Sequence, residues 1–545
     1  MKLYGLLFNE TPQNSGIPGE DMVENNAGGY GYRLDKWLFL DRFLTIGSEG
    51  STYYVGENKL TLDNIKNVLL CLDEAGEMFV DRVVEFAVQH RAPKPGPGIF
   101  ALAIAASKHP DPCIRNYALS KVPTVCQTAT QLFQFLNEVK QMRGFGRGLR
   151  RALAEWYRNK AEDKQLAYQV LKYRSREGWT HKDAMFLCRS ALGTNHKNLC
   201  AIYDYVRGWT TYKNGKFRYE NKERKQIVRA SSLPQLVRIY EEAKEADSVR
   251  QITSLIKEHG LVREMIPNQW LNQPKVWEAL FQKMPAMAML RNLGNMGKHG
   301  LLDPGTDIAR EAVNRLSSSS WVERSRLHPI HFLIACGVYG NGHGYKGSNS
   351  WTVNQAVKSA IEDAFYLSFG NIVPSGKRIC VALDVSLSMD SDAGETGLSC
   401  RGIAAAMAMA TVRSEPHVDV MAFTDQYISL PISKNDSLWT VLKKTSALRF
   451  GRTDCSMPMV HAMKHRQKYD AFVIYTDNET WFGNIHPSQA LRQYRERSGI
   501  KDAKLVVVGI TSTSQTIADP NDKGMLDVSG FDGTVPKVIS DFIKE

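Results

Sequence analysis

The hydrophobic and polar positions of the chain follow two different patterns. From about residue 60 to residue 293, apolar residues recur at i, i+3 and i+4 between proline, glycine or polar breaks, which is typical of amphipathic helices. With short connections and hardly a strand between them, these segments predict a solenoid of helical pairs that bury their apolar faces against one another. No strict repeat is visible, so irregular HEAT-like pairs fit better than tetratricopeptide repeats. The segments are Leu60 to Gln89, Phe100 to Ser107, Arg115 to Val122, Thr128 to Lys140, Gly148 to Lys160, Lys164 to Arg174, Lys182 to Leu192, Leu199 to Arg207, Leu233 to Ala246, Ser248 to His259, Lys275 to Lys283 and Pro285 to Leu293.

The segments on either side of these helices follow a different pattern. We expect the first sixty residues to be extended or irregular, with a short strand candidate at Gly50 to Val55. Loops at residues 317–320 and 340–348 and a helix at Val353 to Phe369 lead to the turn Pro374-Ser375-Gly376. We therefore predict two domains, residues 1–372 and 373–545. Residues 342–347 match GxGxxG, but they follow a helical run instead of a strand, so we expect no dinucleotide site there.

The second domain alternates between short β-rich runs and helices. Strands are expected at residues 379–384, 418–423, 471–476 and 505–510, and helices at 403–413, 438–445, 456–466 and 487–497. This alternation predicts a doubly wound α/β fold with a parallel sheet. In such a sheet, the loops at the carboxyl ends of the strands converge and hold ligands.

Side chains with oxygen atoms occur where these strands end. Asp384, Ser386 and Ser388 follow the first strand, Thr453 lies in the loop Gly-Arg-Thr-Asp at residues 451–454, and Asp477 ends the run at 471–476. Such oxygens suit a hard cation, and Mg²⁺ keeps several waters and so needs few protein groups. DxSxS alone is weak, because Asx and Ser turns that cap a helix use the same residues. Together with the other two loops, it favours a divalent cation, with Mg²⁺ as the best fit.

Composition and charge narrow the function classes. The nine cysteines are scattered without a CxxC pair or zinc-type spacing, which disfavours a zinc site and fits a reducing cytoplasm. The N-terminal apolar run is too short for a signal peptide, and no window approaches a membrane span. We therefore expect a cytoplasmic protein without membrane contact.

Residues 377–545 hold 20 basic and 20 acidic residues, so the net charge of +12 lies entirely in residues 1–376. This charge excess favours a polyanion partner for residues 1–376.

Three basic clusters lie in this charged part. Arginine forks can bind phosphates and aromatic rings can stack on bases, although each cluster by itself is better explained as a solvated helix face. Trp156 and Trp179, taken singly, are typical core residues. Three clusters within the domain that holds the whole charge excess favour nucleic-acid binding. Their candidate residues are Arg147, Arg150 and Arg151 in the first, Lys172, Arg174, Arg176, His181, Lys182 and Arg189 in the second, and Arg291 in the third.

The basic helices followed by the cation loops resemble the Ro ribonucleoprotein autoantigen family, in its bacterial form. The loops at residues 384–388, 451–454 and 477 resemble the metal-ion-dependent adhesion site of von Willebrand factor A domains. The motifs that carry the family resemblance span nearly the whole chain. They are Gly47 to Tyr54, Arg174 to Asp183, Leu290 to Gly294, Arg326 to Pro329, Gly451 to Pro458, Thr476 to Thr480 and Ile517 to Pro520.

The resemblance implies a TROVE domain, a ring of HEAT-like helical pairs closed by a von Willebrand A-like domain. It implies that small noncoding Y RNA binds outside the ring at Lys172, Arg176 and Arg189, with His181 and Lys182 beside them. Single-stranded 3′ ends of defective RNAs would enter the basic hole, with a 3′ exoribonuclease tethered through Y RNA. The implied metal ligands are Asp384, Ser386, Ser388, Thr453 and Asp477. Two positions depart from the family pattern: Arg452 replaces a glycine beside the metal, and Arg189 stands where relatives can have His.

Two other function classes compete with an RNA-binding scaffold. A metal-dependent adhesion module would bind an acidic protein ligand at the cation. A hydrolase would use Asp384, Asp454 and Asp477 to hold catalytic metal, but two-metal nucleases need a richer acidic cluster, and neither GxSxG nor HExxH occurs. We therefore expect a protein that is not an enzyme.

Overall fold

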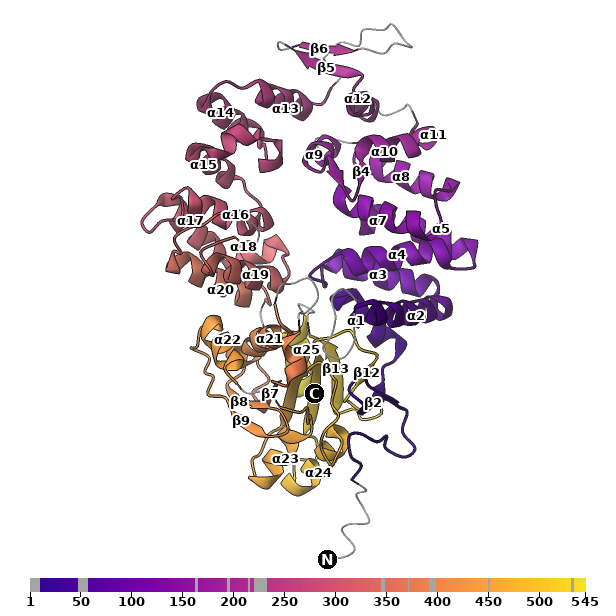
Figure 1. The fold of residues 1–545 in the computed structure, drawn as a ribbon, viewed down its shortest axis with the longest axis vertical. Helices are drawn as coiled ribbons and strands as arrows, with labels where there is room; N and C mark the ends of the chain where they lie inside the picture. The colour runs from indigo at the N-terminus through magenta and orange to yellow at the C-terminus, as the bar shows by residue number, and fades with distance from the viewer. Residues whose placement is uncertain are drawn as a thin grey trace, which may run out of the picture.

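The computed structural model describes residues 10–47, 57–161, 165–193, 197–213, 216–219, 233–344, 348–370, 372–391, 398–448, 451–530 and 534–545. The strand expected at residues 50–55 and the family motif at residues 48–54 lie outside this part of the chain. Figure 1 shows that the helices leave the sheet domain on one side, run away from it, turn and return to it on the other side. The sheet domain joins the two arms of this ring, which confirms the predicted fold class.

The first arm of the ring contains helices that pack in pairs, for example α4 on α5 and α7. Polar side chains define several helix starts: Thr128 and Gln131 form a capping box at α7, and Thr180 and Asp183 do so at α10. The helices of this arm are α1 (Lys36–Ile46), α2 (Glu57–Ala75), α3 (Glu77–Gln89), α4 (Gly96–Lys108), α5 (Pro112–Ser120), α6 (Val122–Val125), α7 (Ala129–Met142), α8 (Arg147–Asn159), α9 (Gln165–Lys172), α10 (His181–Leu187), α11 (Arg189–Leu192) and α12 (Lys197–Val206).

Two expectations for this arm were wrong. The segment predicted as irregular contains α1, whose start is capped by the Asp35 side chain; it is apolar on most sides because it packs between the ring and the sheet domain, so it lacks a clear polar face. The single helix expected from Leu60 to Gln89 is two helices, because Gly76 between them has φ +53°, a conformation that glycine adopts readily.

The second arm brings the chain back to the sheet domain. Here α14 packs on α15, and α19 packs on α20. Its helices are α13 (Gln235–Glu245), α14 (Val249–His259), α15 (Pro274–Gln282), α16 (Ala286–Lys298), α17 (Asp307–Leu316), α18 (Ser319–Ser325), α19 (Pro329–Gly340) and α20 (Gln355–Leu367), with 3₁₀ turns η3 (Arg263–Met265) and η4 (Asn268–Asn272). Two hairpins interrupt the helices, β3 (Ser175–Arg176) with β4 (Trp179–Thr180) and β5 (Thr210–Lys213) with β6 (Lys216–Tyr219).

The second domain is the predicted doubly wound sheet. Its strand order is β13-β11-β10-β7-β8-β9, parallel throughout except for the edge pair β8–β9. The strands are β7 (Arg378–Asp384), β8 (His417–Phe423), β9 (Tyr427–Ser429), β10 (Ala471–Thr476), β11 (Lys504–Gly509) and β13 (Met525–Ser529). The helices are α21 (Cys400–Ser414), α22 (Leu438–Ser446), α23 (Met457–Lys464), α24 (Pro487–Ser498) and α25 (Val535–Lys544), and the 3₁₀ turn η5 (Leu387–Asp390) follows β7.

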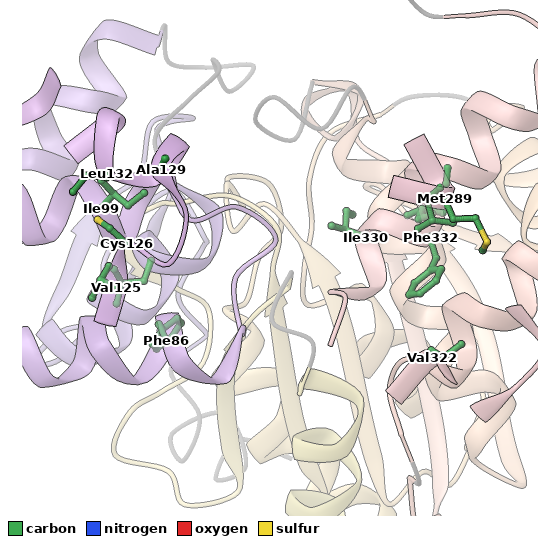
Figure 2. Packing of buried hydrophobic residues seen from close by; sticks show 14 of the residues in the cluster. Phe86, Ile99, Val125, Cys126, Ala129, Leu132, Met289, Val322, Ile330 and Phe332 are labelled. Carbon is green, nitrogen blue, oxygen red and sulfur yellow. The ribbon is translucent and has the colours of Figure 1, made fainter. Parts of the chain in front are cut away.

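In the described part of the chain, buried apolar residues form one long core and one smaller core. The long core runs through both arms and continues onto the face of the sheet that α21 and α25 cover. Figure 2 shows Phe86, Ile99 and Leu132 in the first arm, and Met289 and Phe332 in the second. The smaller core lies on the other sheet face under α23 and α24. The ring and one face of the sheet are thus stabilised by a continuous apolar interior.

Residues 10–34, the N-terminal strap, lie on the sheet domain. Strand β1 (Met22–Glu24) pairs with β2 (Tyr30–Arg33), and β2 pairs with β12 (Gln515–Thr516). The backbone amide of Gln13 donates to the carbonyl of Gly483, 3.1 Å away. The division of the chain at residue 372 stays a prediction, but these first residues add to the surface of the second domain.

Both ends of the ring are bound to the sheet domain by buried polar contacts. Arg42 of α1 donates to Asp527 at 2.5 Å and to the carbonyls of Thr513 and Gln515. On the other side, Glu362 of α20 accepts from the backbone amide of Leu438 at 2.6 Å. No helix in the described ranges is long and apolar enough to cross a membrane.

Candidate metal site and basic helical surface

Asp384 and Asp477 lie at the carboxyl edge of the sheet, where two neighbouring parallel strands end. Asp384 is the last residue of β7, and Asp477 directly follows β10, which is paired with β7 in parallel register. Both side chains are buried. The strand order therefore places the two carboxylates beside each other, as the sequence predicts.

The candidate ligands of this edge are tied together by hydrogen bonds. The backbone amide of Ser386 donates to Asp384 Oδ1 at 2.9 Å, and the Thr476 hydroxyl donates to Asp384 Oδ2 at 2.7 Å. The hydroxyl oxygens of Ser386 and Ser388 are 3.0 Å apart, and Ser388 also hydrogen-bonds Asp477. The loop therefore holds its oxygens in one small group.

Thr453 supplies the observation that best fits a cation. Its Oγ1 is buried and has no hydrogen-bond partner among the described residues, although a buried hydroxyl is normally satisfied. Burial raises the pKa of both Asp384 and Asp477, and the negative charge of Asp477 raises that of Asp384 further. A divalent cation among these oxygens would bind the Thr453 oxygen and neutralise the carboxylates, so the donor set fits Mg²⁺.

The site offers few acidic groups beyond this pair. No three His, Cys, Asp or Glu side chains of the described residues form a group that could hold a metal. Asp454 is engaged elsewhere, because its Oδ1 accepts from the Ser456 hydroxyl at 2.6 Å and from Gln13 Nε2 at 2.7 Å. A cation here would depend on hydroxyl groups and water.

Two supports of the metal loops were not predicted from the sequence. Buried Arg401 of α21 donates to the carbonyls of Val385 and Ser386, at 3.3 and 3.4 Å. The N-terminal strap holds the loop after β10, because the backbone amide of Asn26 and its Nδ2 donate to the buried Glu479 carboxylate at 2.9 and 2.8 Å. Both supports come from distant segments, so no local motif indicates them.

The second basic cluster is built on the hairpin β3–β4 and the helices beside it. Glu177 and Gly178 both have positive φ, as a tight two-residue hairpin turn requires. Arg176, Lys182 and Arg189 are exposed. Their charged groups are therefore accessible to solvent, as the predicted contact with RNA phosphates requires.

Lys172 and Arg174 lie in the same cluster but are held by neighbouring groups. Lys172 Nζ is 3.0 Å from the Tyr168 hydroxyl. Arg174 donates to the carbonyl of Glu264 at 3.0 Å. Both cations are therefore positioned before any ligand binds.

His181 does not present a charge at this surface. It is buried at 2% exposure, its Nδ1 lies 3.0 Å from the Tyr157 hydroxyl, and its ring packs edge-on against Phe133. Burial lowers its pKa to about 4, so the imidazole is neutral near pH 7. His181 is therefore a core residue, and its imidazole does not add a positive charge to the cluster.

The other two clusters lie apart from the hairpin. Arg147, Arg150 and Arg151 are exposed on the first turns of α8, while Arg291 is exposed on α16 in the opposite arm. Trp156 is fully buried, with its Nε1 donating to the carbonyl of Cys126, as expected for a core residue. The candidate residues therefore form separate groups on the ring.

Comparisons with known proteins agree with this architecture. Residues 23–338 match the TROVE domain, and residues 378–543 match the Ro60 vWA domain. The chain belongs to the Ro60 family. It is 36% identical to RNA-binding protein RO60 of Caenorhabditis elegans over 96% of this chain and 90% of that protein.

A bacterial family member gives a similar result in sequence and structure. RNA-binding protein RO60 of Deinococcus radiodurans is 34% identical over 96% of both chains. The crystal structure of Deinococcus radiodurans RO (RSR) protein has a TM-score of 0.67 at 33% identity, covering 94% of this chain and 99% of that one. This confirms the family that the motifs indicated.

Two exposed residues of the present chain lie close to its candidate sites. Arg452 is exposed, and its guanidinium lies 4.7 Å from the centre of the Phe482 ring, so it is held beside the candidate metal site. Phe186 of α10 is 61% exposed between Lys182 and Arg189. The helical pattern offered no signal for Phe186, because an apolar residue in an amphipathic helix is normally assigned to the core.

Proposed function

We propose that this protein is an RNA-binding scaffold without catalytic activity. It binds small noncoding Y RNA on the outside of the helical ring and single-stranded 3′ ends of misfolded or defective RNAs in the central hole. It acts in RNA quality control or processing together with a 3′ exoribonuclease tethered through the Y RNA. The supporting observation is the exposed group Arg176, Lys182 and Arg189 in a family whose two compared members are named RNA-binding proteins.

The charge distribution supports the same proposal. Cations on the ring can neutralise phosphates, while residues 377–545 carry no net positive charge that would attract a polyanion. Exposed Phe186 provides a ring on which an unpaired base can stack. We place the protein in the cytoplasm, since its cysteines are free thiols.

A filter-binding titration tests this proposal with one structured RNA, with and without a single-stranded 3′ tail, at increasing salt. We expect affinity to fall steeply with salt and the tail to strengthen binding. The Lys172→Ala/Arg176→Ala variant should lose affinity for the structured part. Lys501→Ala/Lys523→Ala, which changes two exposed lysines of the sheet domain, is the matched control and should bind normally. Equal, salt-insensitive binding of both RNAs would rule out entry of the tail into the ring.

A second candidate function is the docking of an acidic protein partner at the sheet edge. It is favoured by Thr453 Oγ1, which lies near Asp384 and Asp477 and has no hydrogen-bond partner in the described part of the chain. A bound Mg²⁺ would supply an open coordination position for a carboxylate oxygen, and exposed Arg452 would attract the partner's negative charge. Docking should be lost with EDTA or with Asp384→Ala, whereas RNA binding should survive both.

A further inference from the structure

A cavity of about 590 Å³ lies where the first arm gives way to the second. Residues of α9, α10, α12, β5 and α13 line it, and Figure 1 shows these elements grouped at the end of the ring farthest from the sheet domain. Its volume lies in the range of small-ligand sites. It adjoins the exposed cations, since Arg174 and Lys182 are among its lining residues.

Three tyrosine side chains are among the residues that line the cavity. Tyr205, Tyr212 and Tyr240 come from three different elements. The Arg174 guanidinium lies 5.3 Å from the centre of the Tyr240 ring and is held by the carbonyl of Glu264. Tyrosine rings and arginine planes are the surfaces on which proteins stack unpaired bases.

A charged pair faces the same space. Lys244 Nζ lies 2.9 and 3.0 Å from the two carboxylate oxygens of Glu241, and the Tyr205 hydroxyl also donates to this carboxylate. Glu241 is nearly buried, whereas the Lys244 side chain is 47% exposed. The acceptor is therefore fixed in the wall, while the lysine can move on its long side chain.

We propose that this cavity takes one unpaired guanine nucleotide of the bound RNA, a proposal that rests on the RNA-binding function. Guanine presents an acceptor, O6, beside two donors, N1–H and the N2 amino group. Lys244 donates to O6 and Glu241 accepts from the two donors. Uracil has a carbonyl oxygen, O2, where guanine has the N2 amino group. This oxygen would face the Glu241 carboxylate and be repelled, so uracil is rejected. Arg174 and Lys182 bind the flanking phosphates.

Hairpin RNAs that differ only in one unpaired nucleotide, G or U, test the proposal by fluorescence anisotropy. We expect wild type to bind the G hairpin about tenfold more tightly than the U hairpin. Glu241→Gln should bring this ratio close to one. The matched control is Glu242→Gln, which changes the exposed neighbour on the same helix and should keep the preference. Tyr212→Ala should weaken binding of the G hairpin by about tenfold through lost stacking.

The outcomes separate this proposal from the function on which it rests. Lys172→Ala/Arg176→Ala should weaken both hairpins equally, because phosphate contacts carry no base preference. If wild type binds both hairpins with the same affinity, the guanine pocket is wrong while the RNA-binding function stands. If guanosine monophosphate binds but the hairpins show no preference, the cavity serves a free nucleotide and the proposal is overturned. If neither hairpin binds, both proposals fail.

Discussion

Asn26 holds the carboxylate of Glu479 with two hydrogen bonds, one from its backbone amide and one from its side chain. The two residues are 453 positions apart. Glu479 is completely buried, and burial with the negative charge of Asp477 raises its pKa to about 7. The N-terminal strap thus stabilises a buried acidic group in the loop next to the candidate metal site.

Removing the hydrogen bond from the Asn26 side chain to Glu479 should destabilise the sheet domain. In Asn26→Ala, the buried Glu479 carboxyl group loses a hydrogen-bond donor, and leaving a buried acceptor unsatisfied costs about 1–3 kcal/mol. The expected result is a lower melting temperature in differential scanning calorimetry. Asn435→Ala, in an exposed loop, is the control, and equal melting of the two variants would contradict the role of Asn26.

The ion pair between Arg42 and Asp527 should be far more sensitive to substitution than surface pairs. Both side chains are nearly buried, at 1% and 5% exposure. Arg42→Met leaves Asp527 as a buried unpaired charge, which costs about 3–5 kcal/mol. Guanidinium denaturation should show this loss, and Arg42→Met/Asp527→Leu should recover part of it.

An exposed pair offers the comparison. Arg33 and Asp21 are 61% and 74% exposed, so Arg33→Met should change the unfolding free energy by less than about 1 kcal/mol. A loss as large as that of Arg42→Met would show that burial is not the cause.

Stability should fall between about pH 6.5 and pH 4 because of His181. Burial lowers its pKa from 6.5 to about 4, so within this range the unfolded chain binds a proton that the folded protein does not. Neutral, buried His181 makes its full contribution to the free energy of unfolding above pH 6.5. This contribution decreases as the pH falls, by up to about 1.4 kcal/mol per pH unit. His181→Gln should reduce the slope in unfolding titrations, and the exposed His417→Gln should not.

The Thr453 hydroxyl should determine whether Mg²⁺ binds the sheet edge. Mg²⁺ should raise the melting temperature of the wild type, because a ligand that binds only the folded state stabilises it. Thr453→Val should abolish this increase, while Thr453→Ser, which retains the oxygen, should preserve it. An unchanged response of Thr453→Val would show that this oxygen is not a ligand.

The sequence predicts the four central strands of the sheet domain, because their local preferences agree with the fold, but it does not indicate the edge strands β9 and β13 or the helix α25. The apolar run at residues 471–476 has the bounds of β10, and the polar residues that follow the strands come together at one edge. The helical arms are also recognisable, since their apolar faces follow the helical period. The arrangement of the ring depends on contacts between distant segments and has no comparable signal.

The errors in the prediction come from residues whose environment is set by distant parts of the chain. His181 lies among exposed cations in the sequence, but the register of α10 turns it toward Tyr157 and Phe133. The extended strap gave no sign of its position, because Gln13 and Asn26 bind acidic groups more than 400 residues away. Arg401 resembles an ordinary polar helix residue until its carbonyl partners are known.

The pairing of β2 with β12 sets an order for assembly during synthesis. Strand β2 is complete by residue 33, but its partner at residues 515–516 emerges from the ribosome only after the helical arms have been made. The same holds for Arg42, because its partner Asp527 is synthesised 485 residues later. The helical arms can form pair by pair as they are made, whereas closure of the ring must wait until residue 527 has been synthesised, when a nascent chain can first complete both contacts.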